Sequence, residues 1–239
     1  MNKEQFLEEL NKIGITLTEE QINNLNIYCE FLKEYNSHTN LTSITEDEQI
    51  FLKHFYDSLT FVKALDLKEY NNLLDIGTGA GFPGMVLKIV FPNLNVTLLD
   101  SNNKKITFLR ELAEKIHVNN INFYQGRAED YIKEKREQFD IVTARAVSNL
   151  PVLSELCLPL VKKNGYFIAM KGSNKEEIKE AEFAIKTLGG TIEQIINFTL
   201  PIENSERNII KIKKDKNTPL EYPRKYEKII KKPLKTNVK

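Results

Sequence analysis

A glycine-rich segment, DIGTGAGFPG at residues 75–84, constrains the fold of this chain more than any other feature. It holds four of the ten glycines in the chain, directly after a short apolar run and before an amphipathic stretch. Glycine has no Cβ atom, so it can adopt positive φ and lets the backbone approach a ligand closely. A strand, a glycine loop and a helix in this order predict a nucleotide site in an α/β fold. The alternative is a tight turn that binds nothing.

Short apolar runs alternate with amphipathic stretches from residue 71 onward. The apolar runs predict strands at residues 73–76, 96–99, 121–124, 139–144, 166–170, 191–200 and 208–212. Amphipathic stretches at residues 82–90, 103–116, 129–137, 151–161 and 175–188 are long enough for crossover helices, which implies a parallel sheet. Only residues 201–207 separate the last two strands, too few for a parallel crossover, so these two should pair antiparallel.

The segments on either side of this pattern have a different character. Residues 1–70 read as helical, with a capping box at Thr18 and Gln21 and a second helical pattern over residues 50–65. We therefore divide the chain into an N-terminal helical extension (1–70), an α/β domain (71–213) and a basic C-terminal tail (214–239). The tail contains three prolines and should be irregular, or ordered only by docking.

The formal net charge of +1 hides an uneven distribution. Residues 211–239 carry 11 Lys and Arg against 3 Asp and Glu. Such a tail is either a solvated terminus or a contact for a polyanion, with nucleic acid the first candidate. In the second case its basic side chains supply salt-dependent affinity and no base selection. The candidates are Arg224, Lys225, Lys228, Lys231 and Lys232.

Composition excludes several classes of protein. The chain has 41% hydrophobic and 28% charged residues, and its longest run without a charge, residues 76–87, is too short to span a bilayer. The first ten residues have no apolar core of the kind a secretory signal needs. Cys29 and Cys157 form no disulfide framework, and the three histidines have no metal-ligand spacing. We expect a cytoplasmic monomer without a membrane segment or a metal.

Two features leave the choice of cofactor open between a dinucleotide and S-adenosylmethionine (SAM). The second predicted strand ends at Asp100, 21 residues beyond Gly79, where a carboxylate can accept hydrogen bonds from both ribose hydroxyls. A helix cap is the alternative role for this residue. The glycines at 79, 81 and 84 also satisfy the dinucleotide pattern G-x-G-x-x-G.

The acidic residue that opens the loop favours SAM. Asp75 gives the register D-x-G-x-G-x-G, which resembles motif I of the SAM-dependent methyltransferases. SAM presents a positive ammonium and sulfonium where a dinucleotide presents a pyrophosphate. The closing antiparallel strand pair also resembles the methyltransferase sheet, so we predict a Rossmann-like α/β methyltransferase fold with seven strands, mostly parallel, and an antiparallel last strand. An NAD-dependent oxidoreductase is the alternative.

Other residues are predicted to surround this cofactor. The loop GRAED at residues 126–130 should reach the adenine ring, and Phe82 should lie beside the cofactor. Arg145, at the carboxyl end of the fourth strand, should face the acceptor, where a guanidinium can hold a carboxylate, a phosphate or a guanine edge in bidentate fashion.

The motifs that are missing limit the acceptor. The chain has no [DN]-P-P-[YF] motif, as amine-methylating enzymes use, and neither cysteine follows a proline as pyrimidine C5 attack requires. An acceptor that already has a lone pair and no proton to lose, such as guanine N7, needs only to be positioned. We therefore assign no catalytic base.

Six segments taken together resemble the ribosomal RNA small subunit methyltransferase G family, also called glucose-inhibited division protein B. They are NLTS at residues 40–43, KHFYDSL at 53–59, the glycine loop, GRAED, TARAVSNL at 143–150 and MKG at 170–172. The likeness covers nearly the whole chain. It departs in the tail, where the family often has a turn with Gly and Pro and this chain has YPRKYEKIIKKPL.

The resemblance implies methyl transfer from SAM to N7 of guanine 527 in bacterial 16S rRNA, with the small ribosomal subunit as partner. By position, the SAM contacts of the family fall on Gly77, Phe82, Ala128, Glu129 and Arg145. A non-catalytic RNA-binding module with this fold is a further alternative.

The same resemblance suggests residues for the acceptor pocket. Asn40, His54 and Asp57 lie in the N-terminal motifs, and we expect some of them to face the acceptor. Alternatively, His54 and Asp57, three residues apart on a helix, hydrogen-bond each other or cap the domain junction. Lys171, at the end of the fifth strand, meets RNA phosphate or is simply solvated.

Overall fold

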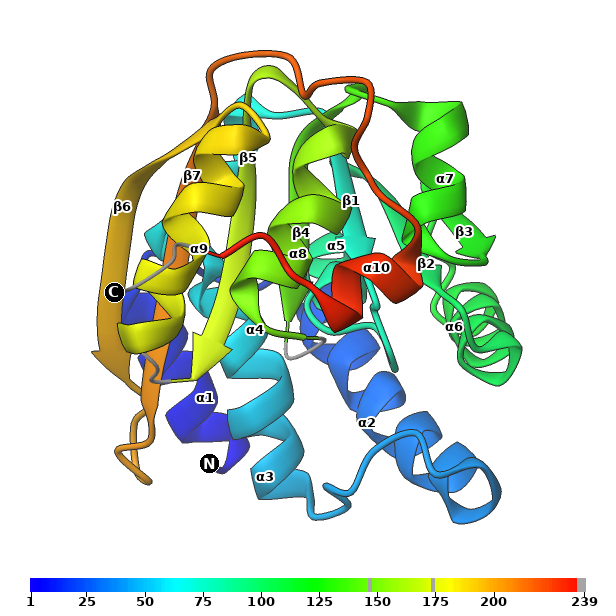
Figure 1. Cartoon of the computed structure of the whole chain (residues 1–239). Helices are drawn as coiled ribbons and strands as arrows, with labels where there is room; N and C mark the ends of the chain where they lie inside the picture. Colours follow the sequence, from blue (N-terminus) through cyan, green and yellow to red (C-terminus); the bar gives the residue numbers. More distant parts are fainter. Residues whose placement is uncertain (146–147, 173–174, 236–239) are drawn as a thin grey trace.

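The computed structural model, which describes residues 1–145, 148–172 and 175–235, is built around one seven-stranded sheet (Figure 1). The strand order is β3-β2-β1-β4-β5-β7-β6. β7 runs antiparallel to both of its neighbours, β5 and β6, and the remaining pairs of neighbouring strands are parallel. The strands are β1 (Asn72–Ile76), β2 (Asn95–Asp100), β3 (Ile121–Gln125), β4 (Phe139–Arg145), β5 (Val161–Gly172), β6 (Gly190–Thr199) and β7 (Glu206–Lys214). The predicted fold class, including the antiparallel last strand, is confirmed.

Helices connect the strands and cover both faces of the sheet (Figure 1). The connecting helices are α5 (Gly84–Val90), α6 (Asn103–Lys115), α7 (Ala128–Lys135), α8 (Leu150–Cys157) and α9 (Lys175–Thr187), with the short turn η4 (Leu158–Leu160) before β5. Helix α8 ends earlier than the predicted 151–161 because Pro159 cannot continue it, and Val161 already belongs to β5.

The N-terminal segment consists of helices, as predicted. They are α1 (Lys3–Lys12), α2 (Glu19–Thr39), α3 (Asp47–Ile50), the π-helical turn η1 (Phe51–Tyr56), α4 (Asp57–Leu59), and the 3₁₀ turns η2 (Thr60–Lys63) and η3 (Leu67–Glu69). Thr18 and Gln21 form the expected capping box, and the side-chain amide of Gln21 also donates to the carbonyl of Val90 at 2.9 Å. This bond ties α2 to the end of α5.

Two hydrophobic cores lie on opposite faces of the sheet. One joins α5 and α6 to the N-terminal helices and contains Cys29, which is buried there as a core residue. The other joins α7, α8 and α9 to Ile229 in the tail. The N-terminal helices therefore share their core with one face of the sheet instead of enclosing a core of their own.

The C-terminal tail is ordered by docking onto the α8 face. It contains one short helix, α10 (Tyr226–Lys231), and residues 236–239 of the predicted tail lie outside the described residues. Arg224 was predicted among the basic side chains that contact a polyanion, and this prediction is wrong. Its guanidinium is paired at 2.6 Å with the fully buried carboxylate of Glu155 and does not face solvent.

Two further observations concern the described part of the chain, residues 1–145, 148–172 and 175–235. None of its helices combines the length and the apolar character that crossing a bilayer requires. No three of its His, Cys, Asp and Glu side chains gather closely enough to hold a metal ion.

Candidate functional site

The glycine loop after β1 is held in shape by Asp75. One oxygen of this buried carboxylate, Oδ2, accepts hydrogen bonds from the Thr78 hydroxyl at 2.7 Å and the Gly84 amide at 2.9 Å. Gly77 and Gly79 have φ values of 67° and 62°, in the left-handed region that favours glycine. Gly81 also has a positive φ, of 103°. The loop is thus bent at three of its glycines, and its last residue, Gly84, is tied back to the carboxylate of Asp75 at its start.

A crevice of about 380 Å³ opens beside this loop. It lies at the carboxyl ends of β1, β2 and β3, where the strand order reverses between β1 and β4, which is the usual ligand site of an open α/β sheet. It is lined by Ile76, Gly77, Leu99, Asp100, Ser101, Lys105, Gly126, Arg127, Ala128, Glu129, Arg145, Leu156 and Tyr226. Five of the seven residues predicted to bind the cofactor line it: Gly77, Asp100, Ala128, Glu129 and Arg145.

Asp100 connects the crevice to the glycine loop. Its Oδ2 atom accepts a hydrogen bond from the Gly79 amide at 3.0 Å, and its Oδ1 atom accepts one from the Asn102 amide at 2.9 Å. The helix that follows, α6, is capped by the side chain of Asn102. The alternative role of Asp100 as the helix cap is therefore wrong. Gly79 does not line the crevice and serves as the point where Asp100 holds the loop.

Phe82 was predicted to lie beside the cofactor, but it does not line the crevice. Its ring is buried between the imidazole of His54, with a centroid separation of 4.2 Å, and the ring of Tyr28, at 5.5 Å. The Arg145 guanidinium lies 5.2 Å from the Phe82 ring centroid, which is a cation–π contact. Phe82 thus supports two residues that face a second cavity.

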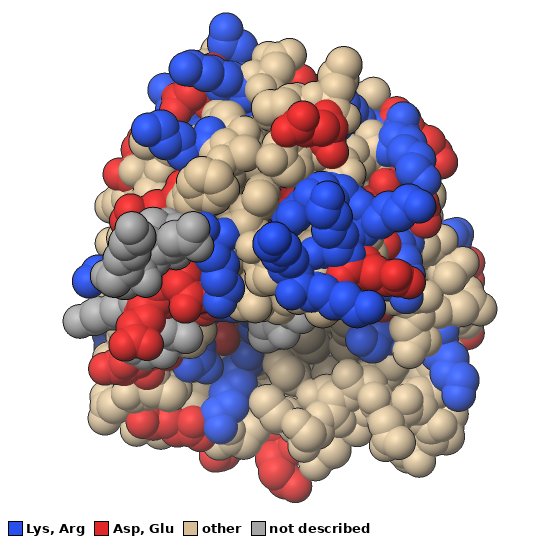
Figure 2. Space-filling view, viewed as in Figure 1, with Lys and Arg blue, Asp and Glu red and all other residues tan. Residues whose placement is uncertain are grey.

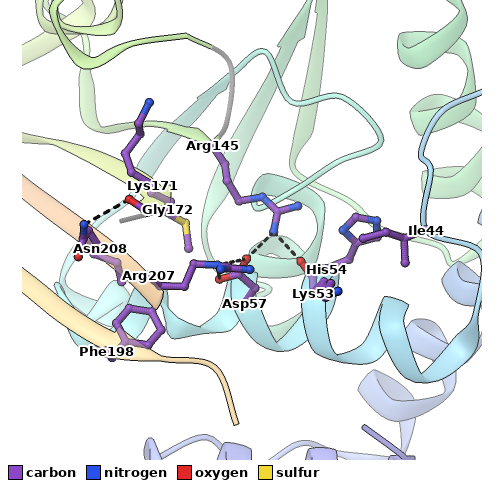
Figure 3. A pocket seen from close by; sticks show the side chains of 12 residues that line it. Ile44, Lys53, His54, Asp57, Arg145, Lys171, Gly172, Phe198, Arg207 and Asn208 are labelled. Carbon is purple, nitrogen blue, oxygen red and sulfur yellow. Dashed lines mark hydrogen bonds and ion pairs between the residues drawn. The ribbon is translucent and has the colours of Figure 1, made fainter. Parts of the chain in front are cut away.

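The second cavity has a volume of about 270 Å³ and lies between the N-terminal helices and the ends of β5, β6 and β7 (Figure 3). Arg145 lines both cavities. The cavity is lined by Ile44, Lys53, His54, Asp57, Arg145, Met170, Lys171, Gly172, Phe198, Arg207, Asn208 and Ile209. Of the four predicted positioning residues, it contains His54, Asp57 and Lys171.

Asn40, the fourth predicted positioning residue, does not face the second cavity. It is exposed and lines neither cavity, and its left-handed backbone, with φ of 52°, ends α2. Thr42, two residues later in the same motif, makes the contact with the site, because its hydroxyl lies 2.9 Å from Nε2 of His54. The side chain of Asn36 holds this loop through two hydrogen bonds to the backbone of Thr42.

Asp57 bridges two arginines across the second cavity (Figure 3). It accepts hydrogen bonds from Nη1 of Arg145 at 3.4 Å and from Nε of Arg207 at 3.1 and 3.2 Å. Arg145 also donates to the carbonyl of Lys53 at 3.1 Å. Asp57 is 6% exposed, so its carboxylate is largely buried between the two arginines. His54 and Asp57 therefore bond to separate partners and not to each other.

His54 is a neutral imidazole at physiological pH. Burial, together with the positive charge of Arg145, lowers its pKa to about 3. The side chain is 8% exposed, and its Nδ1 atom has no hydrogen-bond partner among the described residues. The π-helical turn η1 places His54 on the cavity side together with Asp57. Single π turns of this kind are frequent at functional sites.

The low pKa of His54 predicts a pH dependence of stability. Between pH 6.5 and pH 3 the unfolded chain protonates this histidine and the folded chain does not, so stability falls as the pH falls. From pH 7 to pH 5 we expect native protein to lose about 2 kcal/mol more free energy of unfolding than the His54→Gln variant. Urea unfolding of both proteins at the two pH values measures this difference.

Comparing native protein with His54→Gln separates the effect of His54 on stability from that of Asp75. Burial raises the pKa of Asp75 to about 6, so the folded chain takes up this proton first and gains stability as the pH falls from 6 toward 4. Both proteins keep Asp75, so its effect cancels in the difference. An identical pH dependence in native protein and His54→Gln would show that the folded protein binds a proton on His54 as readily as the unfolded chain does.

Lys171 is held inside the protein. Its ammonium donates to the carbonyl of Ser148 at 2.6 Å and pairs with Glu177 at 2.9 Å, and its side chain is 14% exposed. In Figure 3 it points away from Asp57. Lys171 is thus not the simply solvated lysine that was one alternative.

Sequence reasoning missed several residues of the two cavities. Arg207 reaches Asp57 because β7 pairs antiparallel with β5, which sets Arg207 opposite Gly172. The predicted pairing of the last strands was a signal that could have found it. Arg127, just before α7, also lines the crevice; it lies in the GRAED loop that was predicted to reach the adenine ring, but no role was assigned to its side chain. Tyr226 lines the crevice from the tail, where the sequence carries no corresponding motif.

Comparisons with known proteins agree with this architecture. A family model described as rRNA small subunit methyltransferase G matches residues 21–210. The ribosomal RNA small subunit methyltransferase G of Oceanobacillus iheyensis is 53% identical over 94% of this chain and 96% of its own. The protein of the same name from Bacillus subtilis is 51% identical over 94% and 95%.

Solved structures share the fold at low sequence identity. A SAM-dependent methyltransferase from Aquifex aeolicus has a TM-score of 0.52 and 18% identity, covering 74% of this chain and 97% of its own. The YcgJ protein from Bacillus subtilis has a TM-score of 0.54 and 16% identity, covering 69% and 100%. At this level of identity the likeness concerns the fold alone.

Proposed function

The chain belongs to the rRNA small subunit methyltransferase G family, and from this premise we propose that it transfers a methyl group from SAM to N7 of guanine 527 in 16S rRNA. The observation that carries the proposal is the meeting of two cavities at Arg145. The crevice has the position and the donor and acceptor groups for a nucleoside, and the second cavity has several cationic side chains for an RNA nucleotide. Because the substrate is rRNA, we place the protein in the cytoplasm.

The residues of the crevice fit the chemistry of SAM. Each carboxylate oxygen of Asp100 accepts one hydrogen bond from the protein and retains a lone pair for a ribose hydroxyl. Helix α7 begins at Ala128 without a side-chain cap, so its first amides are donors available to an adenine ring. Asp75 keeps a buried oxygen, Oδ1, that has no partner among the described residues. Its negative charge below the loop favours a cationic ligand.

The second cavity fits an acceptor that needs no base. Guanine N7 has a lone pair and no proton, so its attack on a sulfonium methyl forms the N–C bond as the S–C bond breaks and moves no proton. SAM, when bound, supplies that electrophilic methyl. The side chains of Arg207 and Lys53 are donors for guanine O6 or its phosphate, and the carboxylates paired with them, Asp57 and Glu203, offset part of their charge while the purine becomes positive. The protein acts by positioning.

We expect the Asp100→Asn variant to bind SAM about 10- to 100-fold more weakly than native protein, because an amide replaces a charged acceptor of the ribose. Isothermal titration calorimetry with SAM measures this change. Asp66→Asn is the matched control, since Asp66 is exposed and caps η3, a role that asparagine also fills. Equal SAM affinity in Asp100→Asn and native protein would remove Asp100 from the cofactor site.

Equilibrium dialysis with SAM and with NAD separates the proposed cofactor from its alternative. Saturable binding of SAM alone is the expected result, and saturable binding of NAD alone would overturn the proposal. Incubation of native protein with labelled SAM and small ribosomal subunits from a strain lacking the protein tests the reaction. We expect label in the 16S rRNA, whereas SAM binding without transfer to any RNA would favour a non-catalytic module.

A further inference from the structure

The C-terminal segment 218–232 is fastened to the protein next to the cofactor crevice. The guanidinium of Arg136 donates to the carbonyls of Thr218 and Tyr222 at 2.8 Å. Arg224 donates from Nε and Nη2 to both carboxylate oxygens of Glu155, a side chain with no exposed surface on α8. These contacts and the burial of Ile229 set the position of α10 over α8.

Tyr226, the first residue of α10, contributes an aromatic ring to the crevice. It lines the crevice together with Leu156 of α8 and Ala128 of α7. The Arg127 guanidinium lies 4.9 Å from the Tyr226 ring centroid. The ring is 37% exposed although the segment around it is fixed. An exposed, held aromatic ring beside the first amides of α7 is a stacking surface for a purine.

The other side of the same segment is basic and faces solvent. Lys225, Lys228, Lys231 and Lys232 are exposed, and Figure 2 shows basic side chains gathered where α10 lies in Figure 1. Exposed lysines at this density bind polyanions through phosphate contacts that depend on salt. Helix α10, six residues long, therefore places an aromatic ring in the wall of the crevice and exposes lysines to solvent.

We infer that the segment 218–232 is part of both binding sites: Tyr226 packs against the adenosine portion of SAM, and the exposed lysines bind phosphates of the rRNA substrate. The inference rests on the proposed function. Both ligands contact α10 in its docked position, so each ligand stabilises the position that the other one binds. The two ligands consequently strengthen each other, and by linkage the factor is the same in both directions.

The test of the cofactor contact is the SAM affinity of Tyr226→Ala, measured by isothermal titration calorimetry. We expect binding about tenfold weaker than in native protein, with most of the affinity restored in Tyr226→Phe, because the ring is retained. Leu220→Ala is the matched control, since Leu220 is 90% exposed in the same segment. Native affinity in Tyr226→Ala, with an unchanged thermal melting curve, would overturn the contact.

The test of the coupling uses deproteinised 16S rRNA and SAM. The double variant Lys228→Ala/Lys231→Ala should bind SAM alone as native protein does. Its RNA affinity should fall, and the slope of log K against log salt should lessen by about two units. In native protein, RNA should raise SAM affinity severalfold, and this gain should shrink in the variant. Lys68→Ala/Lys163→Ala is the control, because these exposed lysines lie before β1 and at the start of β5, away from the crevice.

The outcomes separate the inference from the proposed function. If native protein binds SAM and methylates rRNA, but RNA leaves the SAM affinity of native protein unchanged, the coupling is wrong and the proposed function stands. If native protein binds no SAM, the proposed function is wrong, and the inference that rests on it is wrong as well.

Discussion

Arg145→Ala should reduce methyl transfer about a thousandfold while the chain stays folded. Arg145 lines both cavities, donates to Asp57 and the Lys53 carbonyl, and packs over Phe82. Without this guanidinium, the wall shared by the cofactor and the acceptor loses its fixed geometry, and a donor near the reacting atoms disappears. Losses of a single preorganised donor reduce rates about 10²- to 10³-fold.

The measurement is transfer of labelled methyl from SAM to 16S rRNA under single-turnover conditions. Arg145→Lys keeps the charge but not the planar group, so its rate should remain far below native. Arg110→Ala is the matched control, since Arg110 is an exposed arginine on α6 that packs on Phe123. Folding is checked by thermal melting, and Asp57 keeps its ion pair with Arg207 in the variant. Full activity of a folded Arg145→Ala variant would remove Arg145 from the site.

Arg224→Ala should lower the free energy of unfolding by about 3–5 kcal/mol. The change leaves Glu155, which has no exposed surface, as a carboxylate without its charged partner inside α8. Breaking one half of a buried pair is costly because the remaining charge has lost both water and its counterion. For a chain of this length the melting temperature should fall by about 10 °C.

A second variant separates this mechanism from general damage to the tail. In Glu155→Leu/Arg224→Met both charges are replaced by apolar groups of similar volume, so most of the lost stability should return. Urea unfolding at neutral pH measures all three proteins. Arg224→Ala with native stability would show that the ion pair does not hold the tail. Because this pair positions α10, we also expect Arg224→Ala to bind SAM more weakly than native protein.

The fold could be predicted to a large extent because its signals are local. One signal is the pair of glycines at residues 77 and 79 with an acidic residue before them. The other is the alternation of apolar and amphipathic stretches along the chain. Each signal depends on a few neighbouring residues. The short connection between the last two strands predicted that they pair antiparallel, as they do. The crevice followed from these elements, since strand ends and the switch point determine where a ligand lies.

The second cavity could be predicted only in part, because long-range packing creates it. Phe82 was predicted beside the cofactor and lies beneath His54, since the N-terminal helices cover that side of the loop. Arg207 reaches Asp57 across 150 positions of sequence, through the insertion of β7 between β5 and β6. Tyr226 reaches the crevice only because Arg224 and Ile229 dock the tail. The predicted pairing of the last two strands could have indicated Arg207, but no local pattern encodes the contacts of Phe82 and Tyr226.

The reaction is tested most directly by mapping N7-methylguanosine in 16S rRNA from cells with and without this protein. Borohydride reduction followed by aniline cleavage breaks RNA at this nucleotide, and primer extension locates the break. We predict a break at guanine 527 when native protein is present, none in cells that lack it, and none in cells that carry only Arg145→Ala. A break at guanine 527 that persists in cells without the protein would contradict the account.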